Sequence, residues 1–373
     1  MTTPADDLPP EAWAAALAGL AAMGPARLRA VLGTWAPEEA WARVAAGSGC
    51  SRPAVALVCR PDPAGLASMW RAAARRVSVP ALWAAHQRAG IAVMLPGGPG
   101  FPAGLRADPD PPAILFARGE PAVLDGRRVA IVGTRRCTRY GRDVAYDLGR
   151  DLAVNGVRVI SGLALGVDGA AHRGALAGGA PPVAVVGSGL DVVYPSGHGT
   201  LWEQVATNGL LLSEAPLGAR PEPWRFPVRN RVITALAEVV VVVESGEKGG
   251  SRHTVEAAMV RDRPVMAVPG SVRSPMSSYT NGLLADGYHP VRDALDVLVA
   301  LGLSSAPISK LDQRVEPEQE VAPVLDALGW EPATFDDLCS RTGRSPSEVS
   351  VALARLQAGG WVAEQGGWWE RVT

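Results

Sequence analysis

Six arginines lie in the stretch Arg127–Arg142, and four of them follow a short apolar run. Val129–Val132 has the composition of a buried β-strand, and this run ends at Gly133. A strand that turns into a helix at a glycine directs free backbone N–H groups and the helix dipole at one point. Guanidinium groups beside that point favour a phosphate ligand. Solvated arginines on an ordinary turn explain this stretch equally well. The arginines after the glycine are Arg135, Arg136, Arg139 and Arg142.

Two further basic segments follow later apolar runs, and both are expected to be loops. Residues 220–231 carry four arginines against one carboxylate, with Trp224 and Phe226 between them. Residues 248–252 contain Lys248, two glycines, a serine and an arginine. Single strands of nucleic acid are bound by cations that follow the backbone and by rings that stack on the bases. We therefore expect a channel for single-stranded nucleic acid; the alternative is that the two rings belong to the core.

The sequence predicts neither a cofactor nor a metal site. Gly133 is followed by Thr134 and arginines, whose side chains would fill the space that a dinucleotide needs in a Gly-x-Gly-x-x-Gly turn. No Walker motif is present. Asp168 and His172 have the spacing of two ligands on one helix face, but no third ligand is evident. We expect Asp168 to cap a helix and His172 to be a buried, hydrogen-bonded histidine.

Strand-like and helix-like segments alternate over residues 127–301. Runs of Val, Ile and Leu without polar alternation are typical of parallel strands that are covered on both faces. We expect an α/β domain with a Rossmann-like, doubly wound, mainly parallel sheet. Ligands of such sheets bind outside the carboxyl ends of the strands, which is where the three basic segments would lie. The expected strands are Arg128–Val132, Val157–Ser161, Pro182–Val186, Gly209–Ser213, Glu238–Val243 and Pro264–Val268.

Length and composition limit the classes of protein. A chain of 373 residues predicts two or three domains, and a hydrophobic content of 47% is enough for their cores. A net charge of −1 excludes a global basic field, so a nucleic-acid site must be local. The four cysteines form no Cys-x-x-Cys pair, and neither a signal peptide nor a membrane-length apolar run is evident. We expect a cytoplasmic protein with no membrane partner.

Two smaller regions flank the α/β domain of residues 79–301. Residues 1–78 are expected to form a small helical module, either a packing unit or a helix-hairpin-helix DNA element around Gly24-Pro25. Residues 302–319 are expected to be a linker. Residues 320–373 show three helix-like segments and a hairpin, which is the winged-helix pattern. Because basic residues on its third helix are few, we favour a protein contact over duplex binding for this domain.

Several long motifs resemble the DNA-processing protein A (DprA/Smf) family. They follow one another in order between residues 80 and 300, which makes the resemblance specific. The motifs are Ile-Val-Gly-Thr-Arg at 131–135, Ser-Gly-Leu-Ala-Leu-Gly-Val-Asp-Gly-Ala-Ala-His at 161–172, Gly-Ser-Gly-Leu-Asp-Val-Val-Tyr-Pro at 187–195, Leu-Leu-Ser-Glu-Ala-Pro at 211–216, Phe-Pro-Val-Arg-Asn-Arg-Val-Ile at 226–233 and Ala-Val-Pro-Gly-Ser at 267–271.

This resemblance implies a non-catalytic protein of natural transformation that binds single-stranded DNA, protects it and loads the RecA recombinase onto it. It also implies a homodimer through the Rossmann-like domain; a contact with the single-strand-binding protein is a further expectation. Arg136 joins the expected site because it follows the first loop. The family's DNA-binding loops fall on Gly133, Thr134 and Arg135, on Ser161 and Gly162, on Phe226, Arg229, Asn230 and Arg231, and on Lys248, Gly250 and Ser251.

The chain departs from the family pattern at two loops, and other functions stay open. Lys248–Thr254 has a glycine where relatives usually carry serine, and the stretch after Tyr194-Pro195 lacks the lysine that is frequent in relatives. Residues 249–256, Gly-Gly-Ser-Arg-His-Thr-Val-Glu, imperfectly match the Gly-Gly-x-Gly-Thr-x-x-Glu loop of lysine-decarboxylase-like phosphoribohydrolases. An enzyme of that family acting on nucleoside monophosphates is the alternative function. A scaffold without DNA contact is the third.

Overall fold

The computed structural model describes residues 8–303 and 317–372. It divides into two compact units, Met1–Ile308 and Ser309–Thr373. Most of the expected linker, residues 304–316, lies outside the described residues. The expected boundary at residue 78 falls inside the first unit and stays a prediction. Over the described ranges, no helix has both the length and the apolar character needed to cross a membrane.

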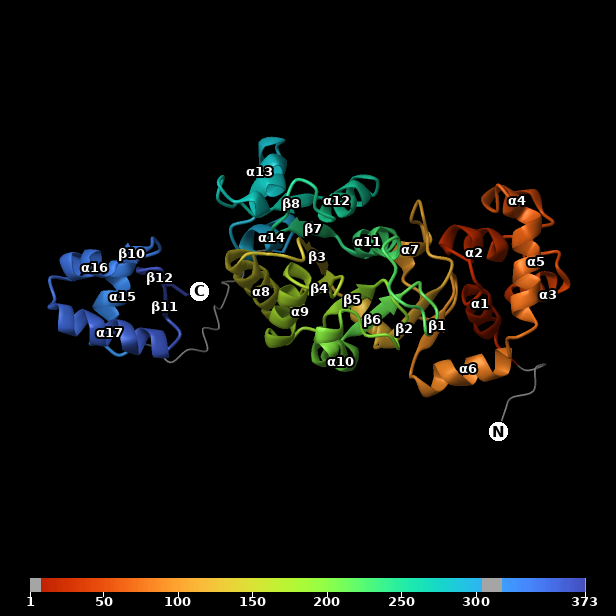
Figure 1. The fold of residues 1–373 in the computed structure, drawn as a ribbon, viewed down its shortest axis with the longest axis horizontal. Coiled ribbons are helices and arrows are strands. Elements are labelled where there is room, and N and C mark those ends of the chain that lie inside the picture. Colours follow the sequence, from red (N-terminus) through yellow and green to blue (C-terminus); the bar gives the residue numbers. More distant parts are fainter. Residues whose placement is uncertain (1–7, 304–316, 373) are drawn as a thin grey trace. The chain divides into compact units, whose positions relative to one another are not determined.

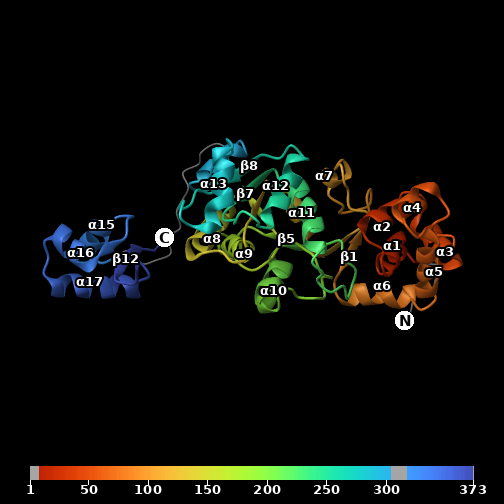
Figure 2. The ribbon, with the colours of Figure 1, turned by 45° about the horizontal axis from the view of Figure 1, so that its top comes forward.

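A nine-stranded sheet forms the centre of the first unit (Figures 1 and 2). The strand order is β1-β2-β6-β5-β4-β3-β7-β8-β9; the strands from β6 to β9 run parallel, and β2 is antiparallel to both of its neighbours. The predicted α/β fold with a mainly parallel sheet is confirmed. The strands are β1 (Ala92–Met94), β2 (Leu115–Gly119), β3 (Arg128–Val132), β4 (Arg158–Ser161), β5 (Val183–Val186), β6 (Leu210–Ser213), β7 (Val239–Val242), β8 (Val265–Ala267) and β9 (His289–Pro290).

Helices cover both faces of this sheet because successive strand residues point to opposite sides. Val129 and Ile131 of β3 share a core with helices α8 (Arg139–Val154), α9 (Val167–Ala177) and α14 (Ala294–Ala300). Ala130 and Val132 share another with α11 (Arg225–Leu236), α12 (Ser251–Met259) and α13 (Ser278–Ala285). Helix α10 (Gly199–Asn208) packs against β2 and β6. Strand order reverses at β3, between β4 and β7, so a binding crevice is expected at the carboxyl ends of these strands.

Residues 220–231 are not a loop throughout, as the sequence led us to expect, because α11 begins at Arg225. Pro227 lies in the first turn of α11, where a backbone N–H has no partner within the helix and proline is tolerated. This helix is the crossover from β6 to β7 and packs against β3, β4 and β5. Phe226, Arg229 and Arg231 are therefore held on a rigid element rather than on a loop.

Six helices form the N-terminal part of the first unit. Each of the first five begins with a proline, whose missing N–H costs nothing at the first helical position. Leu17 and Trp70 are fully buried in a core that continues to Phe116 of β2 and Trp202 of α10. The helices are α1 (Pro10–Ala18), α2 (Pro25–Leu32), α3 (Pro37–Ala46), α4 (Pro53–Val58), α5 (Pro63–Ala74) and α6 (Val79–Arg88).

An ion-pair network joins these helices to the sheet domain through the segment of residues 107–112, which follows α7 (Ala103–Arg106). The Asp110 carboxylate accepts from Arg29 of α2 and, at 2.9 Å, pairs with Arg231 of α11. Asp108 accepts two hydrogen bonds, of 2.7 and 2.8 Å, from Arg261. We call this set of ion pairs the arginine clasp.

The second unit has the predicted winged-helix fold. Its helices are α15 (Ala322–Leu328), α16 (Phe335–Thr342) and α17 (Pro346–Ala358), followed by the hairpin of β11 (Val362–Gln365) and β12 (Trp368–Arg371), with β10 (Ala333–Thr334) beside β12. Thr334 and Ser345 cap α16 and α17, each in a capping box. Residues 317–372 contain nine carboxylates and four arginines, a net charge of −5.

Candidate nucleic-acid interface

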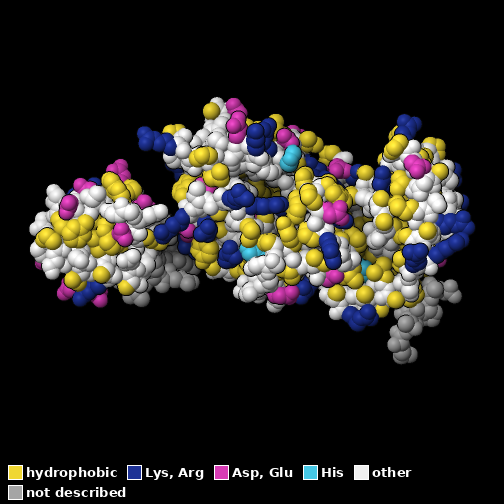
Figure 3. Space-filling model, in the orientation of Figure 1, with side chains coloured by type: hydrophobic (Ala, Val, Ile, Leu, Met, Phe, Trp, Pro, Cys, Tyr) yellow, Lys and Arg dark blue, Asp and Glu magenta, His cyan; other side chains and the backbone are white. Residues whose placement is uncertain are grey.

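A cleft of about 680 Å³ opens at the carboxyl ends of β3 and β7, where the strand order reverses. We call it the switch-point cleft. It is lined by the loop after β3, the first turns of α11, the N-terminus of α12 and residues such as Ala164 and Tyr194. Basic side chains gather beside a hollow on this face of the first unit (Figure 3). The fold therefore brings segments that are far apart in the sequence to one rim of the sheet.

Nine of the predicted site residues line the switch-point cleft. Four come from the loop after β3, three from α11 and two from the N-terminus of α12. They are Gly133, Thr134, Arg135, Arg136, Phe226, Arg229, Asn230, Gly250 and Ser251. Arg135 and Arg136 are exposed, so their guanidinium groups are available to an anion in solution.

An aromatic platform with a cation over it forms one wall of this cleft. The guanidinium carbon of Arg135 lies 4.5 Å from the centre of the Phe226 ring. The Tyr194 ring lies 5.5 Å from that of Phe226 at an angle of 37° and is 38% exposed. Aromatic faces next to cations are suited to stacking on bases while the charge meets the phosphates. Tyr194 was not among the site residues predicted from the sequence; its only signal was its place in the motif at residues 187–195.

Arg229 lines the cleft but is buried and hydrogen-bonded. Its Nη1 donates to the Gly162 carbonyl at 2.8 Å and to the Val185 carbonyl, and its Nη2 lies 3.9 Å from the Asp168 carboxylate. Burial lowers the pKa of Arg229 to about 10, and burial raises the pKa of Asp168 although Arg229 opposes this shift. Arg229 thus fixes the loop after β4 beneath the cleft, and its charge is largely balanced within the protein.

The expected anion site at the N-terminus of α8 is not available. The Glu244 carboxylate, which is buried, accepts from the Thr138 backbone N–H at 2.8 Å and from the Thr138 hydroxyl at 2.7 Å. Helix α12, in contrast, has no side-chain cap and no carboxylate in its first turn, and Gly250 and Ser251 at its start line the cleft. The N-terminus of α11 also meets the cleft without a side-chain cap or an acidic residue in its first turn, so the positive dipole ends of both α11 and α12 are open to the cleft.

Four predicted site residues do not line the switch-point cleft. Ser161 is buried, and its hydroxyl donates to the Ile131 carbonyl at 2.6 Å. Gly162 lies beneath Arg229, whose guanidinium leaves no space for a Cβ atom there. Arg231 is buried in the arginine clasp and also donates to Glu214 at 2.5 Å. Lys248 is exposed on the loop between β7 and α12. Any DNA contact by these residues stays a prediction.

Asp168 and His172 have structural roles. Asp168 accepts from the backbone N–H groups of Gly162 and Ala164 at 3.2 and 3.4 Å, so it braces the loop before α9 instead of capping the helix as expected. His172 is buried, as predicted, and its Nε2–H donates to the Val183 carbonyl at 3.2 Å. Within the described ranges, no group of three metal-ligating side chains is found.

Comparisons with known proteins agree with this architecture. The family model described as DNA recombination-mediator protein A matches residues 92–302, and the DprA winged helix domain matches residues 310–367. The chain is 40% identical over 279 residues to the putative DNA processing protein DprA of Mycobacterium tuberculosis, covering 72% of this chain and 71% of that relative. It is 33% identical over 280 residues to protein Smf of Escherichia coli, covering 73% and 75% of the two chains.

Two solved structures are similar to this chain. DNA processing protein A of Streptococcus pneumoniae superposes with a TM-score of 0.63 at 28% identity, over 78% of this chain and 98% of that chain. The protein of the same name from Helicobacter pylori, whose structure concerns its mode of binding single-stranded DNA, gives a TM-score of 0.52 at 31% identity, over 57% and 95%. With a family model that matches more than half of its length, this chain belongs to the DNA-processing protein A (DprA/Smf) family.

Proposed function

We propose that this protein binds single-stranded DNA in the switch-point cleft and acts as a DNA-processing protein without catalysis. The observation that carries the proposal is the meeting of exposed Arg135 and Arg136, the Phe226–Tyr194 platform and the uncapped N-terminus of α12 around one cleft. Cations and a helix N-terminus suit the phosphates, and the rings suit any base. The family membership and the single-stranded-DNA-binding relative from Helicobacter pylori support it.

Titration with single-stranded and duplex oligonucleotides at two salt concentrations tests this function. We expect the single strand to bind more tightly and the affinity to fall with salt, because phosphate contacts release counterions. Arg43→Ala is a matched control for variants of the cleft arginines, because Arg43 is half-exposed on α3 and does not line the cleft. Equal affinity for duplex and single strand, or no binding of either, would contradict the proposal.

The role in natural transformation, with RecA loading, is the finer part of the proposal. The family description as a recombination-mediator protein supports it. RecA loading requires that the protein assist RecA on DNA already covered by single-strand-binding protein, which is also a proposed partner. We expect this chain to accelerate RecA-dependent strand exchange on such covered DNA. If the wild-type protein binds the strand but leaves the rate of RecA-dependent strand exchange unchanged, it does not load RecA.

A homodimer through the Rossmann-like domain is also proposed. Met259 and Val260, at the end of α12, are 58% and 65% exposed, and these adjacent apolar side chains are the surface that we propose for the contact with a second copy. Mass measurement by light scattering is expected to give twice the chain mass. Val260→Glu should shift the mass towards the monomer without changing the far-ultraviolet circular dichroism, and a wild-type monomer at all concentrations would reject the dimer.

The phosphoribohydrolase alternative is not favoured. Its acidic loop residue would correspond to Glu256, whose side chain is 61% exposed, pairs with His253 at 3.3 Å and does not line the switch-point cleft. Release of base from nucleoside monophosphates, abolished by Glu256→Gln, is the result that would restore this alternative.

A further inference from the structure

Positive charge is concentrated on the last three of the six N-terminal helices. Residues 52–88, which include α4, α5 and α6, contain six arginines against one carboxylate, a net charge of +5. Residues 8–51 contain three arginines and three carboxylates, so their charges cancel. The six arginines are all exposed; they are Arg52, Arg60, Arg71, Arg75, Arg76 and Arg88.

These six arginines have no acidic partner in the part of the chain that the structure describes. No ion pair between described residues involves any of them. The one carboxylate of this stretch, Asp62, instead accepts from the Gly65 backbone N–H at 2.8 Å as the N-cap of α5. We call the six side chains the unpaired arginines. Their guanidinium groups are available to an anion in solution.

Helix stability does not account for this distribution of charge. Arg52 is the N-cap of α4, where the positive end of the helix dipole disfavours a cation. Arg71 and Arg75 are four residues apart at the end of α5, so their like charges repel each other. The dipole of α5 offsets only part of this repulsion, because Arg76 adds a third cation at the same helix end. The unpaired arginines therefore point to a partner that carries many negative charges.

Helix α5 presents a low, basic surface on the outer side of the N-terminal helices. Helices α3, α4 and α5 lie at the end of the first unit away from the sheet (Figures 1 and 2). Basic side chains follow this outer edge (Figure 3). Helix α5 buries Ala67, Trp70 and Ala74, and its exposed residues between the arginines are small. Those at a spacing of four are Ala64, Ser68 and Ala72.

This surface suits duplex DNA better than a single strand. The large hydrophobic side chains exposed in residues 52–88 are Leu57 and Met69, whereas Trp70 is buried and Trp83 is half-buried. Single strands are bound by exposed rings that stack on bases, but a duplex hides its bases and is bound through its phosphates. The 12 residues of α5 extend over about 18 Å, the length of about five base pairs.

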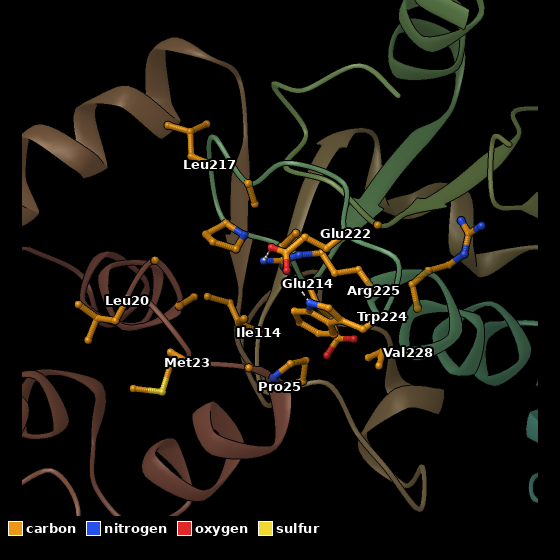
Figure 4. Close-up of a pocket in the computed structure, with 18 of the residues that line it drawn as sticks. Leu20, Met23, Pro25, Ile114, Glu214, Leu217, Glu222, Trp224, Arg225 and Val228 are labelled. Atoms are coloured by element: carbon orange, nitrogen blue, oxygen red, sulfur yellow. Dashed lines mark hydrogen bonds and ion pairs between the residues drawn. The ribbon is translucent and has the colours of Figure 1, made fainter. Parts of the chain in front are cut away.

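The turn between α1 and α2, where the sequence left a helix-hairpin-helix DNA element open, is less suited to phosphate. It lines a second cleft, of about 550 Å³, with Leu20, Met23 and Pro25 on one side and Glu222 and Trp224 on the other (Figure 4). The Glu222 side chain is 50% exposed. Apolar side chains and a carboxylate thus face each other across this cleft, and neither attracts a phosphate.

We propose that Arg71, Arg75 and Arg76 at the end of α5 bind the phosphates of duplex DNA without regard to its sequence. None of the unpaired arginines lines the switch-point cleft, so this surface is separate from the site that we propose for the single strand. Its affinity is that of non-specific binding, with a dissociation constant on the order of 10⁻⁴–10⁻⁶ M at physiological salt. Single strands in the switch-point cleft are therefore bound more tightly.

Three double variants separate local charge from overall charge. Arg71→Ala/Arg75→Ala removes two cations from one face of α5. Arg71→Lys/Arg75→Lys keeps both charges. Arg106→Ala/Arg173→Ala is the matched control, because both arginines are exposed, line neither cleft and contribute the same charge to the first unit. Thermal melting of each variant shows whether it is folded.

The test is fluorescence anisotropy with a duplex and with a short oligo(dT) over a series of salt concentrations. We expect Arg71→Ala/Arg75→Ala to bind the duplex more weakly than wild type. Its slope of log affinity against log salt should be shallower by about 1.8, because each lost phosphate contact removes about 0.9 from the slope. The lysine variant and the matched control should keep the wild-type slope. Oligo(dT) affinity should stay within about twofold in all three variants.

Equal duplex affinity and equal slopes for wild type and folded Arg71→Ala/Arg75→Ala would overturn the inference, as would an equal loss in the matched control. The same holds if the alanine variant keeps duplex binding but loses binding to vesicles of anionic phospholipid, which would assign the arginines to a membrane surface. Failure of the proposed function gives a different result, because wild type would then bind no oligo(dT).

Discussion

Single residues of the switch-point cleft divide into exposed cations that are free to meet a ligand and buried ones that hold the cleft in shape. The sequence identified Arg135, Arg136 and Arg229 alike, but only the first two are exposed. Burial of Arg229 depends on Asp168 and on carbonyl groups contributed by distant strands. No local pattern encodes these partners, so residue type was predictable and residue role was not.

Phe226→Ala is expected to weaken single-strand binding by about 1–3 kcal/mol, the contribution of one stacked base. The ring is half-buried and in contact with Arg135 and Tyr194, so the loss of stability should be small. Anisotropy titration with oligo(dT) measures the first effect, and a melting scan measures the second. A large drop in melting temperature with unchanged affinity would place Phe226 in the core rather than in the site.

His172 makes a pH-dependent contribution to stability. Burial lowers the pKa of His172 from 6.5 to about 4 in the folded protein. Between these values the unfolded chain binds more protons, so the free energy of unfolding falls as pH decreases from 6.5 towards 4, by about 3 kcal/mol. Urea denaturation between pH 6.5 and about 4 should show a smaller loss in the free energy of unfolding for His172→Gln than for wild type. Parallel pH curves for the two proteins would contradict this account.

Among the structural elements, α11 contributes most to the site and was the hardest to predict. Its buried apolar side chains Val232, Ile233 and Leu236 come only after Pro227 and three arginines, so the segment read as a loop. The valine-rich strands, in contrast, were predicted to within a residue or two at each end. The carboxylate that occupies the N-terminus of α8 was also missed, because Glu244 follows a strand that is distant in the sequence.

Arg231 of α11 belongs to the arginine clasp and also pairs with the buried Glu214, so this side chain is expected to stabilise the position of α11. Arg231→Met leaves the buried Glu214 carboxylate without its partner, so we expect a loss of about 3–5 kcal/mol in the free energy of unfolding. Arg118→Met breaks a more exposed pair with Glu203 and should cost less than about 1 kcal/mol. Urea denaturation compares the two variants. If Arg231→Met changes the free energy of unfolding little but weakens DNA binding, Arg231 contacts the strand.

For the whole molecule, charge is divided unevenly between the two units. The winged-helix unit has nine carboxylates against four arginines in residues 317–372, and Arg355 of α17 already pairs with Glu318 at 2.9 Å. Deleting residues 320–373 should therefore leave single-strand affinity within about twofold, because an acidic surface adds little to binding of a polyanion. A loss of tenfold or more in the same anisotropy assay would assign DNA contacts to the winged helix.

The salt dependence of oligo(dT) binding by wild type, by Arg135→Ala/Arg136→Ala and by Arg43→Ala tests the central claim most directly. Each phosphate contact contributes about 0.7 to the slope of log affinity against log salt for a single strand. We predict that the double variant loses affinity for every sequence and that its slope is shallower by about 1.4, while Arg43→Ala matches wild type. Equal slopes for all three proteins would show that the strand does not bind at the carboxyl ends of β3 and β7.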